Sequence, residues 1–187
     1  MACFENIPVE DIEACINAEV PSGISEVNLK YAVHADITTF PVPLAIGSVG
    51  YTYAKANVID DDIVFSAGKG FGKIKVQVNT GELTFEGVGS AGNMKQKSGL
   101  AFYVPSNDAQ LLGFIRTRLN SPMVFAVPER DGQNRLLGDK FNPAYITEVK
   151  GTTGKTGEDD KGVQFTVTSH AIPLIYNGDI QEFVVTP

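Results

Sequence analysis

The chain has 187 residues, 43% of them hydrophobic, and a formal charge of −7 from 22 acidic and 15 basic residues. This length suits one domain, residues 1–187, with a substantial core. The negative charge argues against general affinity for nucleic acid, but it leaves open a surface past which nucleic acid slides. No apolar run approaches the roughly 20 residues that cross a bilayer, and no signal region is evident, so we expect no membrane association.

Residues 1–22 are predicted to form an N-terminal arm with a short helical segment, since apolar residues recur at helical spacing from Val9 to Ile16. Both cysteines, Cys3 and Cys15, fall in this arm. Two thiols do not make a disulfide framework, so a reduced pair is the favoured interpretation. A bridge between them stays open as the alternative.

The first strand is predicted at Ser25–Val33, where apolar and polar residues alternate and one face is expected to meet water. Asp36–Leu44 contains two prolines, so we expect it to lie outside any central strand. Tyr51–Ile59 is a candidate strand. The whole section 40–72 is irregular for a compact domain, and we therefore predict a long exposed loop there.

Residues 73–88 carry the clearest local signal, because apolar and polar residues alternate on both sides of a glycine-containing turn. Pairing Val78 with Leu83 aligns apolar residues along both arms and sets Lys75 opposite Glu86. A slip of one residue would put every apolar side chain against a polar one. The pattern thus predicts an antiparallel hairpin with this register.

The centre of the chain is predicted to form a strand, a helix, a second strand and a turn. The apolar runs Leu100–Val104 and Met123–Val127 flank a stretch with helical periodicity, and the turn Arg130–Gln133 follows. Neither apolar run alternates with polar residues, so we expect both strands to be covered on both faces.

The main helix is predicted at about 107–119. Asn107 and Gln110 have the spacing of a loose capping box, and Pro122 follows the helix end. We expect one apolar face of this helix to pack on a sheet. The residues of that face are Leu111, Leu112, Ile115 and Leu119.

The second half of the chain contains further strand signals. Tyr145–Val149 and Val163–Thr168 are predicted to pair, and Leu174–Tyr176 with Phe183–Val185 to form a closing hairpin. The segment 151–162 has four glycines and an acidic run, which predicts a second long exposed loop. The predicted fold is mainly β: an antiparallel β-sandwich or small barrel with one main α-helix.

The sequence shows no pattern of a catalytic, cofactor-binding or metal site. Gly68–Gly72 has the wrong spacing for a nucleotide-binding loop and leads into a strand. Asp60–Asp62 and Glu158–Asp160 lack the alternate-position pattern of a calcium loop. The two histidines, His34 and His170, form no ligand pair at helical spacing. We predict that the protein is not an enzyme and holds no cofactor.

Several motifs follow one another in a recognisable order between residues 23 and 180. They are Gly23-Ile24, Gly68–Val88, Leu100–Val127, Asp131-Gly132, Leu136–Gly138, Thr152–Gly154, Asp160–Gly162, Phe165 and Pro173–Gly178. This order resembles the tail tube (major tail) proteins of bacteriophages, which are related to the tube proteins of contractile injection systems. The resemblance is one of pattern, since each motif alone is unspecific.

The resemblance implies a structural virion protein, made in the bacterial cytoplasm and built into a phage or prophage tail. In that family, six copies close their sheets into a ring, and rings stack into a tube for DNA passage. Expected partners are further copies of the chain, other tail proteins, and DNA that passes without specific binding. The exposed segments 40–72 and 151–162 are available for contacts between rings.

One polar sheet face is expected to line the channel. The candidates are Glu82, Thr84 and Glu86, or the equivalent face of Val163–Thr168. On the predicted hairpin, Lys73 and Lys75 share the first of these faces, so local cancellation of charge is expected.

Two other function classes fit the same β architecture. One is a capsid decoration protein or another virion β-protein. The other is a ligand-binding β-sandwich, for instance for carbohydrate. The chain has no Trp and six Tyr, which disfavours a sugar-stacking platform.

Overall fold

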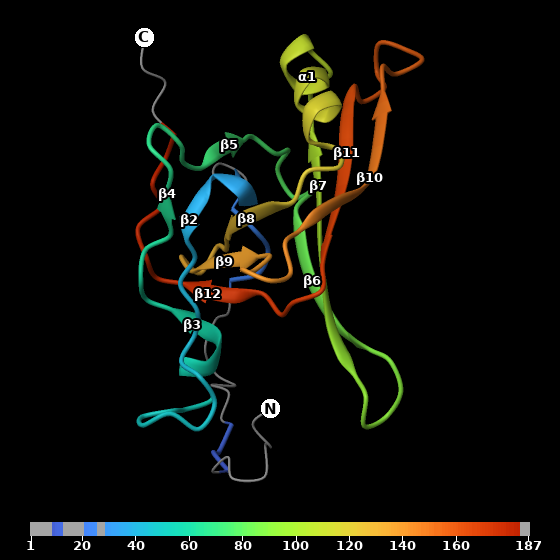
Figure 1. Cartoon of the computed structure of the whole chain (residues 1–187). Helices are drawn as coiled ribbons and strands as arrows, with labels where there is room; N and C mark the ends of the chain where they lie inside the picture. Colours follow the sequence, from blue (N-terminus) through green and yellow to red (C-terminus); the bar gives the residue numbers. More distant parts are fainter. Residues whose placement is uncertain (1–8, 13–20, 26–28, 184–187) are drawn as a thin grey trace.

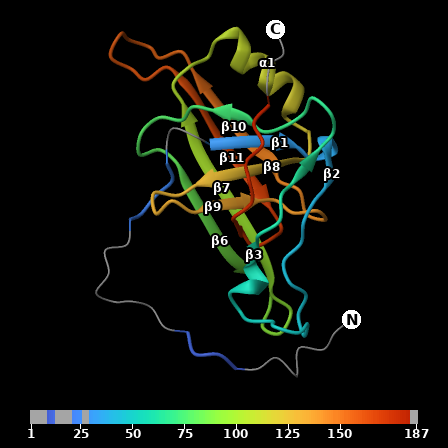
Figure 2. The ribbon, with the colours of Figure 1, turned by 90° about the vertical axis from the view of Figure 1, so that its left-hand side faces the viewer.

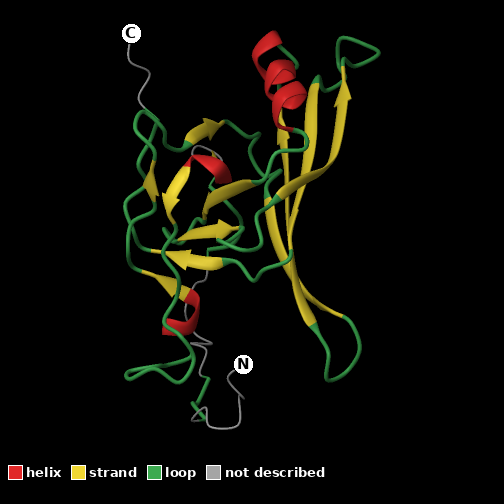
Figure 3. Ribbon diagram, in the orientation of Figure 1, coloured by secondary structure: helices red, strands yellow, loops and turns green. Residues whose placement is uncertain are grey.

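The computed structural model describes residues 9–12, 21–25 and 29–183. The described chain is mainly β with one α-helix, and its two larger sheets pack face to face without closing into a barrel (Figures 1 and 3). The predicted fold class is confirmed, with the sandwich as the form it takes. Most of the arm 1–22, including Cys3 and Cys15, lies outside the described residues, and the described part 9–12 is not helical.

The larger sheet has six short strands. In spatial order they are β3 (Val58–Ile59), β12 (Leu174–Tyr176), β9 (Asn134–Leu137), β8 (Met123–Pro128), β1 (Leu29–Val33) and β5 (Gly72–Ile74). All neighbours are antiparallel except β12 and β3. Met123–Val127 is buried throughout, which confirms that this central strand is covered on both faces. The same prediction is wrong for Leu100–Val104, where buried residues alternate with the partly exposed Ala101 and Tyr103, so that strand is covered on one face only.

The second sheet has four longer strands and is antiparallel throughout. Its order is β10 (Tyr145–Thr152), β11 (Gly162–Ser169), β7 (Lys95–Val104) and β6 (Glu82–Val88). The predicted pair β10–β11 is confirmed. The expected loop 151–162 is shorter than predicted, because the strands extend to Thr152 and begin again at Gly162.

Three layers enclose two apolar cores. The strands of the six-stranded sheet run across those of the four-stranded sheet (Figure 2), and Phe102, Phe125 and Phe165 are buried between them. Val124 and Ala126 point the other way, because successive strand residues alternate in direction. They join a second core beneath a two-stranded sheet, β2 (Ile37–Thr39) with β4 (Val64–Phe65).

The predicted hairpin at residues 73–88 is wrong. β5 pairs with β1, placing Ile74 beside Leu29, while β6 pairs with β7, placing Leu83 beside Leu100. Residues 75–81 carry the chain from one sheet to the other. Alternation determines which face of a strand is apolar but does not select its partner, and Leu100 matches Leu83 as well as Val78 would.

Three further strand predictions need correction. In the described part of the first strand, no face is wet, because Lys30 and Ala32 are both buried between neighbouring strands. The candidate strand at Tyr51–Ile59 is reduced to β3, after a 3-10 helix at Lys55–Asn57. Of the predicted closing hairpin, β12 has both its sides paired, with β3 and β9, and residues 184–185 of the second arm lie outside the described residues.

Helix α1 (Ala109–Arg118) closes one end of the sandwich (Figure 1). Asp108 is its N-cap, because its carboxylate accepts the Leu111 N–H at 2.8 Å, so the capping assignment to Asn107 is wrong by one residue. The helix rests on the core through Phe114, whose ring lies 5.0 Å from that of Tyr31.

The apolar face of α1 is only partly covered. Leu111 and Ile115 pack against the core as predicted, whereas Leu112 is 53% and Leu119 41% exposed. No helix residue is fully buried. The helix therefore seals an edge of the core and does not cover a whole sheet face.

Candidate assembly surface

One face of the four-stranded sheet is left uncovered by the described residues. Leu100, Phe102 and Phe165 point from this sheet into the core, so their strand neighbours point to the opposite side. In Figure 1 the six-stranded sheet, the small sheet and α1 all lie on the core side. We call the opposite side the outer face.

The outer face is mostly polar. Paired residues point to the same side, so the register places these residues on it: Glu82, Thr84, Glu86, Val88, Lys95, Lys97, Gly99, Ala101, Tyr103, Tyr145, Glu148, Lys150, Thr152, Gly162, Gln164, Thr166 and Thr168. Three glutamates and three lysines therefore face the same way, so their formal charges cancel. Most of the remaining side chains are hydroxyls or amides.

Both polar faces that the sequence proposed as alternatives belong to this one surface. β7 joins them, because Ala101 pairs with Glu82 on one side and with Thr166 on the other. Lys73 and Lys75, expected on the same face, are not there: Lys73 belongs to β5 in the other sheet and Lys75 follows it. Sequence reasoning missed Lys97, because the predicted hairpin gave Glu86 a different partner strand. It missed Lys150, because the predicted strand ended at Val149 whereas β10 continues to Thr152.

Ion pairs between glutamates and lysines bring opposite charges together on the outer face. Glu86 lies 3.3 Å from Lys97, and Glu148 lies 2.7 Å from Lys150. The hydrogen bond from Lys150 lowers the pKa of the Glu148 carboxyl. Exposed pairs of this kind add little stability, and their effect is on the local potential.

Hydroxyl groups fill the spaces between the charges. The Thr147 and Thr168 hydroxyls lie 3.1 Å apart, and Thr84 donates to the Gly99 carbonyl at 3.2 Å. These three hydroxyl groups are thus already engaged in hydrogen bonds within the sheet.

The four-stranded sheet ends in two long open edges. Each edge strand, β6 with seven residues and β10 with eight, has a paired strand on one side only among the described residues. Such edges offer unpaired backbone donors and acceptors to another chain. The edges of the six-stranded sheet carry fewer unpaired backbone groups, because its end strands β3 and β5 have only two and three residues.

The β6–β7 hairpin extends past the end of the sandwich (lower right in Figure 1). On its core side it carries Phe85, 65% exposed, and Met94, 61% exposed. A Cβ added at Gly87 would lie 2.7 Å from the Met94 methyl carbon, so these residues share one side. The core side of this sheet therefore stays apolar beyond the area that the rest of the fold covers.

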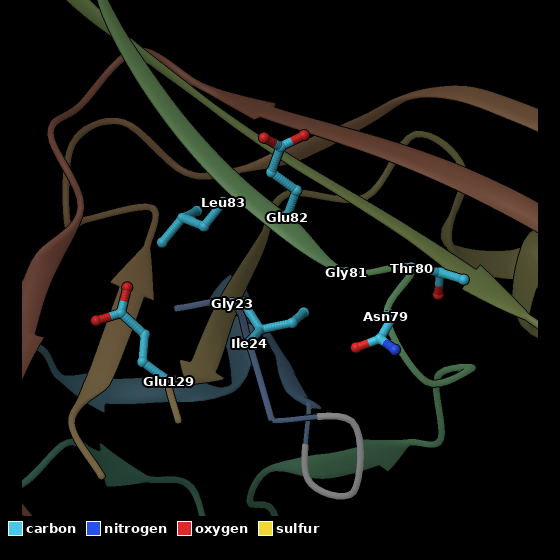
Figure 4. Close-up of a pocket in the computed structure, with 8 residues that line it drawn as sticks. All are labelled: Gly23, Ile24, Asn79, Thr80, Gly81, Glu82, Leu83 and Glu129. Carbon is cyan, nitrogen blue, oxygen red and sulfur yellow. The ribbon is translucent and has the colours of Figure 1, made fainter. Parts of the chain in front are cut away.

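A cleft with a volume of about 500 Å³ lies at the start of β6 (Figure 4). Ile24, Leu83 and Glu129 line it, together with Gly23 and Gly81, while the Glu82 side chain points to the other side of β6 (Figure 4). The Glu129 carboxylate is bonded to Arg135 at 2.9 Å. These groups include no nucleophile–base pair, and we assign no ligand to the cleft.

Two further searches cover the described residues only. They hold no group of three or more His, Cys, Asp or Glu that could bind a metal ion. Among their helices, none has the length and apolar character of a membrane span.

The surface that remains as a candidate for function is the outer face with its two open edges. Comparisons of the chain with protein-family models, with curated proteins and with solved structures gave no match.

Proposed function

We propose that this chain is the repeating subunit of a tube of the phage-tail type, in which copies form hexameric rings that stack around a channel for DNA. One observation carries the proposal: an uncovered polar sheet face bounded by two long open edges. Edges of this length favour pairing with further copies. The ring order of six comes from the resemblance to the tail tube family.

Ring closure joins β6 of one copy to β10 of the next. Because the four strands alternate in direction, β6 and β10 run in opposite senses. Copies related by rotation therefore meet as an antiparallel pair, and the alternation continues around the ring. An even number of strands in each copy makes this possible.

The register at the junction is restricted by face and by charge. Outer-face residues must lie opposite one another, so only even shifts are allowed. Two such registers place Glu82 or Glu86 opposite Lys150. The register between them places Glu86 opposite Glu148, where like charges repel. We expect one of the first two.

The outer face lines the channel in this arrangement. Duplex DNA carries one negative charge per roughly 1.7 Å of its axis, so a basic wall would hold it. Here Lys97 and Lys150 are each in contact with a glutamate. A nearly neutral, hydroxyl-rich wall lets the duplex pass.

Stacking of rings uses the parts that project along the channel direction. At one end, these are the tip of the β6–β7 hairpin and the section 40–54, which exposes Val42, Val49 and Tyr53. At the other end stand α1 and the connection 153–161 (Figure 1). Contact between unlike ends does not close on itself and grows into a filament.

Cysteine cross-linking tests the junction. With Cys3 and Cys15 replaced by Ser, Lys150→Cys is combined in turn with Glu82→Cys, Thr84→Cys or Glu86→Cys. We expect a ladder of disulfide-linked species up to six copies for position 82 or 86. Equal, weak linking at all three positions would contradict the assigned edges.

Light scattering on a size-exclusion column and negative-stain images test assembly itself. We expect rings or tubes that grow with protein concentration. The control is Thr84→Pro or Phe85→Pro. Neighbouring residues of an edge strand point their N–H groups to opposite sides, so at one of these two positions the N–H points away from β7 and proline removes only a bond to another copy. The variant that keeps the wild-type melting temperature should stay monomeric. A wild-type protein that is monomeric at every concentration would refute the tube and favour a decoration protein.

A further inference from the structure

Two lysines lie directly opposite each other at the end of the six-stranded sheet. Lys30 on β1 pairs with Lys73 on β5, and like charges in this position repel. Lys30 is also 92% buried (8% exposed), on the side of β1 that faces the second core. A buried ammonium group requires a counter-ion.

That counter-ion comes from a distant part of the chain. The Glu182 carboxylate accepts from the Lys30 Nζ at 2.6 Å and lies 2.7 Å from the Lys73 Nζ through its other oxygen. Hydrogen bonds from Lys30 and Lys73 lower the pKa of the Glu182 carboxyl. One carboxylate thus relieves the repulsion between two neighbouring strands.

The backbone around Glu182 is seated by a second, independent set of contacts. We call residues 181–183 the strap. The Phe71 N–H donates to the Gln181 carbonyl at 2.9 Å, and the Phe183 N–H donates to the Phe71 carbonyl at 3.0 Å. This adds a parallel strand pairing just before β5. The strap crosses Gly70 so closely that a Cβ there would lie 2.8 Å from its backbone.

We propose that the strap is a latch, set by Glu182, that closes the β5 edge of the six-stranded sheet against pairing with another copy. Lys30 is the buried member of this ionic group, while the Glu182 and Lys73 side chains are 41% and 52% exposed, and we assign to the group the role of fixing this arrangement of the chain. With this edge closed, lateral pairing is confined to β6 and β10. That last consequence rests on the proposed function, whereas the latch itself does not.

Two variants release the strap by different means. Glu182→Gln removes the counter-ion and leaves the backbone unchanged, while Gly70→Ala pushes on the strap backbone and leaves the ions unchanged. Gly157→Ala is the matched control, because a Cβ there meets nothing within 4 Å. Lys30→Met with Glu182→Gln removes both charges, which keeps the fold should Glu182→Gln alone destabilise it too far.

Hydrogen exchange at the Phe71 and Phe183 amides measures how often the strap opens, because these two N–H groups form its backbone hydrogen bonds. We expect exchange at least about tenfold faster in Glu182→Gln, Gly70→Ala and the double variant, since local opening sets these rates. Gly157→Ala should match the wild type. Unchanged exchange in both Glu182→Gln and Gly70→Ala overturns the latch.

The edge-closing role is measured in the background of the β6 proline variant, where tube assembly is absent. Light scattering should then show new dimers or larger species only when the strap is released. Monomers in every released variant overturn this role. Because wild-type β6 is not used, the result is independent of whether the wild-type protein forms tubes.

Discussion

Glu86 on β6 lies directly opposite Lys97 on β7, and their side-chain atoms are 3.3 Å apart. The pair joins strands at residues 82–88 and 95–104, and it sits on the outer face beside the hydroxyls of Thr84 and Thr168. A second pair, Glu148 with Lys150, lies within the far edge strand, β10. Positive and negative charges are therefore paired on both edge strands of the outer face, and substitution of either partner should change its electrostatic potential.

Removing two of these carboxylates should convert the outer face into a DNA-binding wall. Glu86→Gln with Glu148→Gln leaves three lysines and one glutamate, 3 − 1 = +2 for each copy, where the wild type has 3 − 3 = 0. At about 50 mM salt we expect the assembled variant to bind duplex DNA tightly and to lose it as salt rises. The measurement is a titration of labelled duplex against assembled protein.

The matched control is Lys97→Gln with Lys150→Gln, which gives the opposite charge and should bind no DNA. Tight, salt-sensitive binding by the assembled wild-type protein would contradict a channel wall that lets DNA slide.

The helix cap should be sensitive to acid. The hydrogen bond from the Leu111 N–H, followed by that from Ser106, lowers the pKa of the Asp108 carboxyl below its ordinary value of 3.8. The cap therefore stabilises the folded state above the ordinary pKa, and this contribution is lost as the pH falls through the lowered folded-state pKa. Urea unfolding should show Asp108→Ala less stable than the wild type at neutral pH, with the gap closing in strong acid. Asn107→Ala is the control and should unfold like the wild type at every pH.

Two phenylalanines on the core side of the same sheet should behave in opposite ways. Phe165 is 1% exposed and its ring stacks 5.1 Å from Phe102, so Phe165→Ala should cost about 3–5 kcal/mol of unfolding free energy. Phe85 is largely exposed, and Phe85→Ala should cost about 0.5 kcal/mol or less in the monomer. Chemical denaturation of the dilute protein measures both.

At assembling concentrations the order should differ. Phe85→Ala is expected to weaken tube formation, because it removes apolar surface that a neighbouring copy would cover. Assembly of Phe85→Ala at the wild-type level would show that this residue lies outside the contacts between copies.

The connection 153–161 should be dispensable for folding and needed for assembly. The Asp159 carboxylate accepts the Lys155 and Thr156 N–H groups, each at 2.7 Å, so the turn is organised locally. Replacing residues 153–161 by a short Gly-Ser link should change the unfolding free energy by about 1 kcal/mol or less, while tube formation falls. A collapsed fold with intact assembly would reverse this assignment.

Side-chain pattern alone predicts the buried faces of two strands and the position of the helix. Alternation along Val163–Thr168 and the unbroken apolar run Met123–Val127 each predicted the burial that the structure shows. The helix was placed within about two residues at its start, since caps compete over such distances. These features depend on local side-chain pattern, so they can be read without knowing the fold.

Apart from the pair β10–β11, which strands are neighbours could not be predicted from the side-chain pattern. Residues 73–88 satisfy the alternation of a hairpin, yet β5 pairs with β1 and β6 pairs with β7, in different sheets. The candidate surface depends on the same choice: Glu82 and Thr166 share a face because β7 lies between them. Likewise, Glu182 meets Lys30 across 152 positions of sequence. Pattern specifies which way a side chain points, whereas its partner is chosen by packing among segments that are distant in the chain.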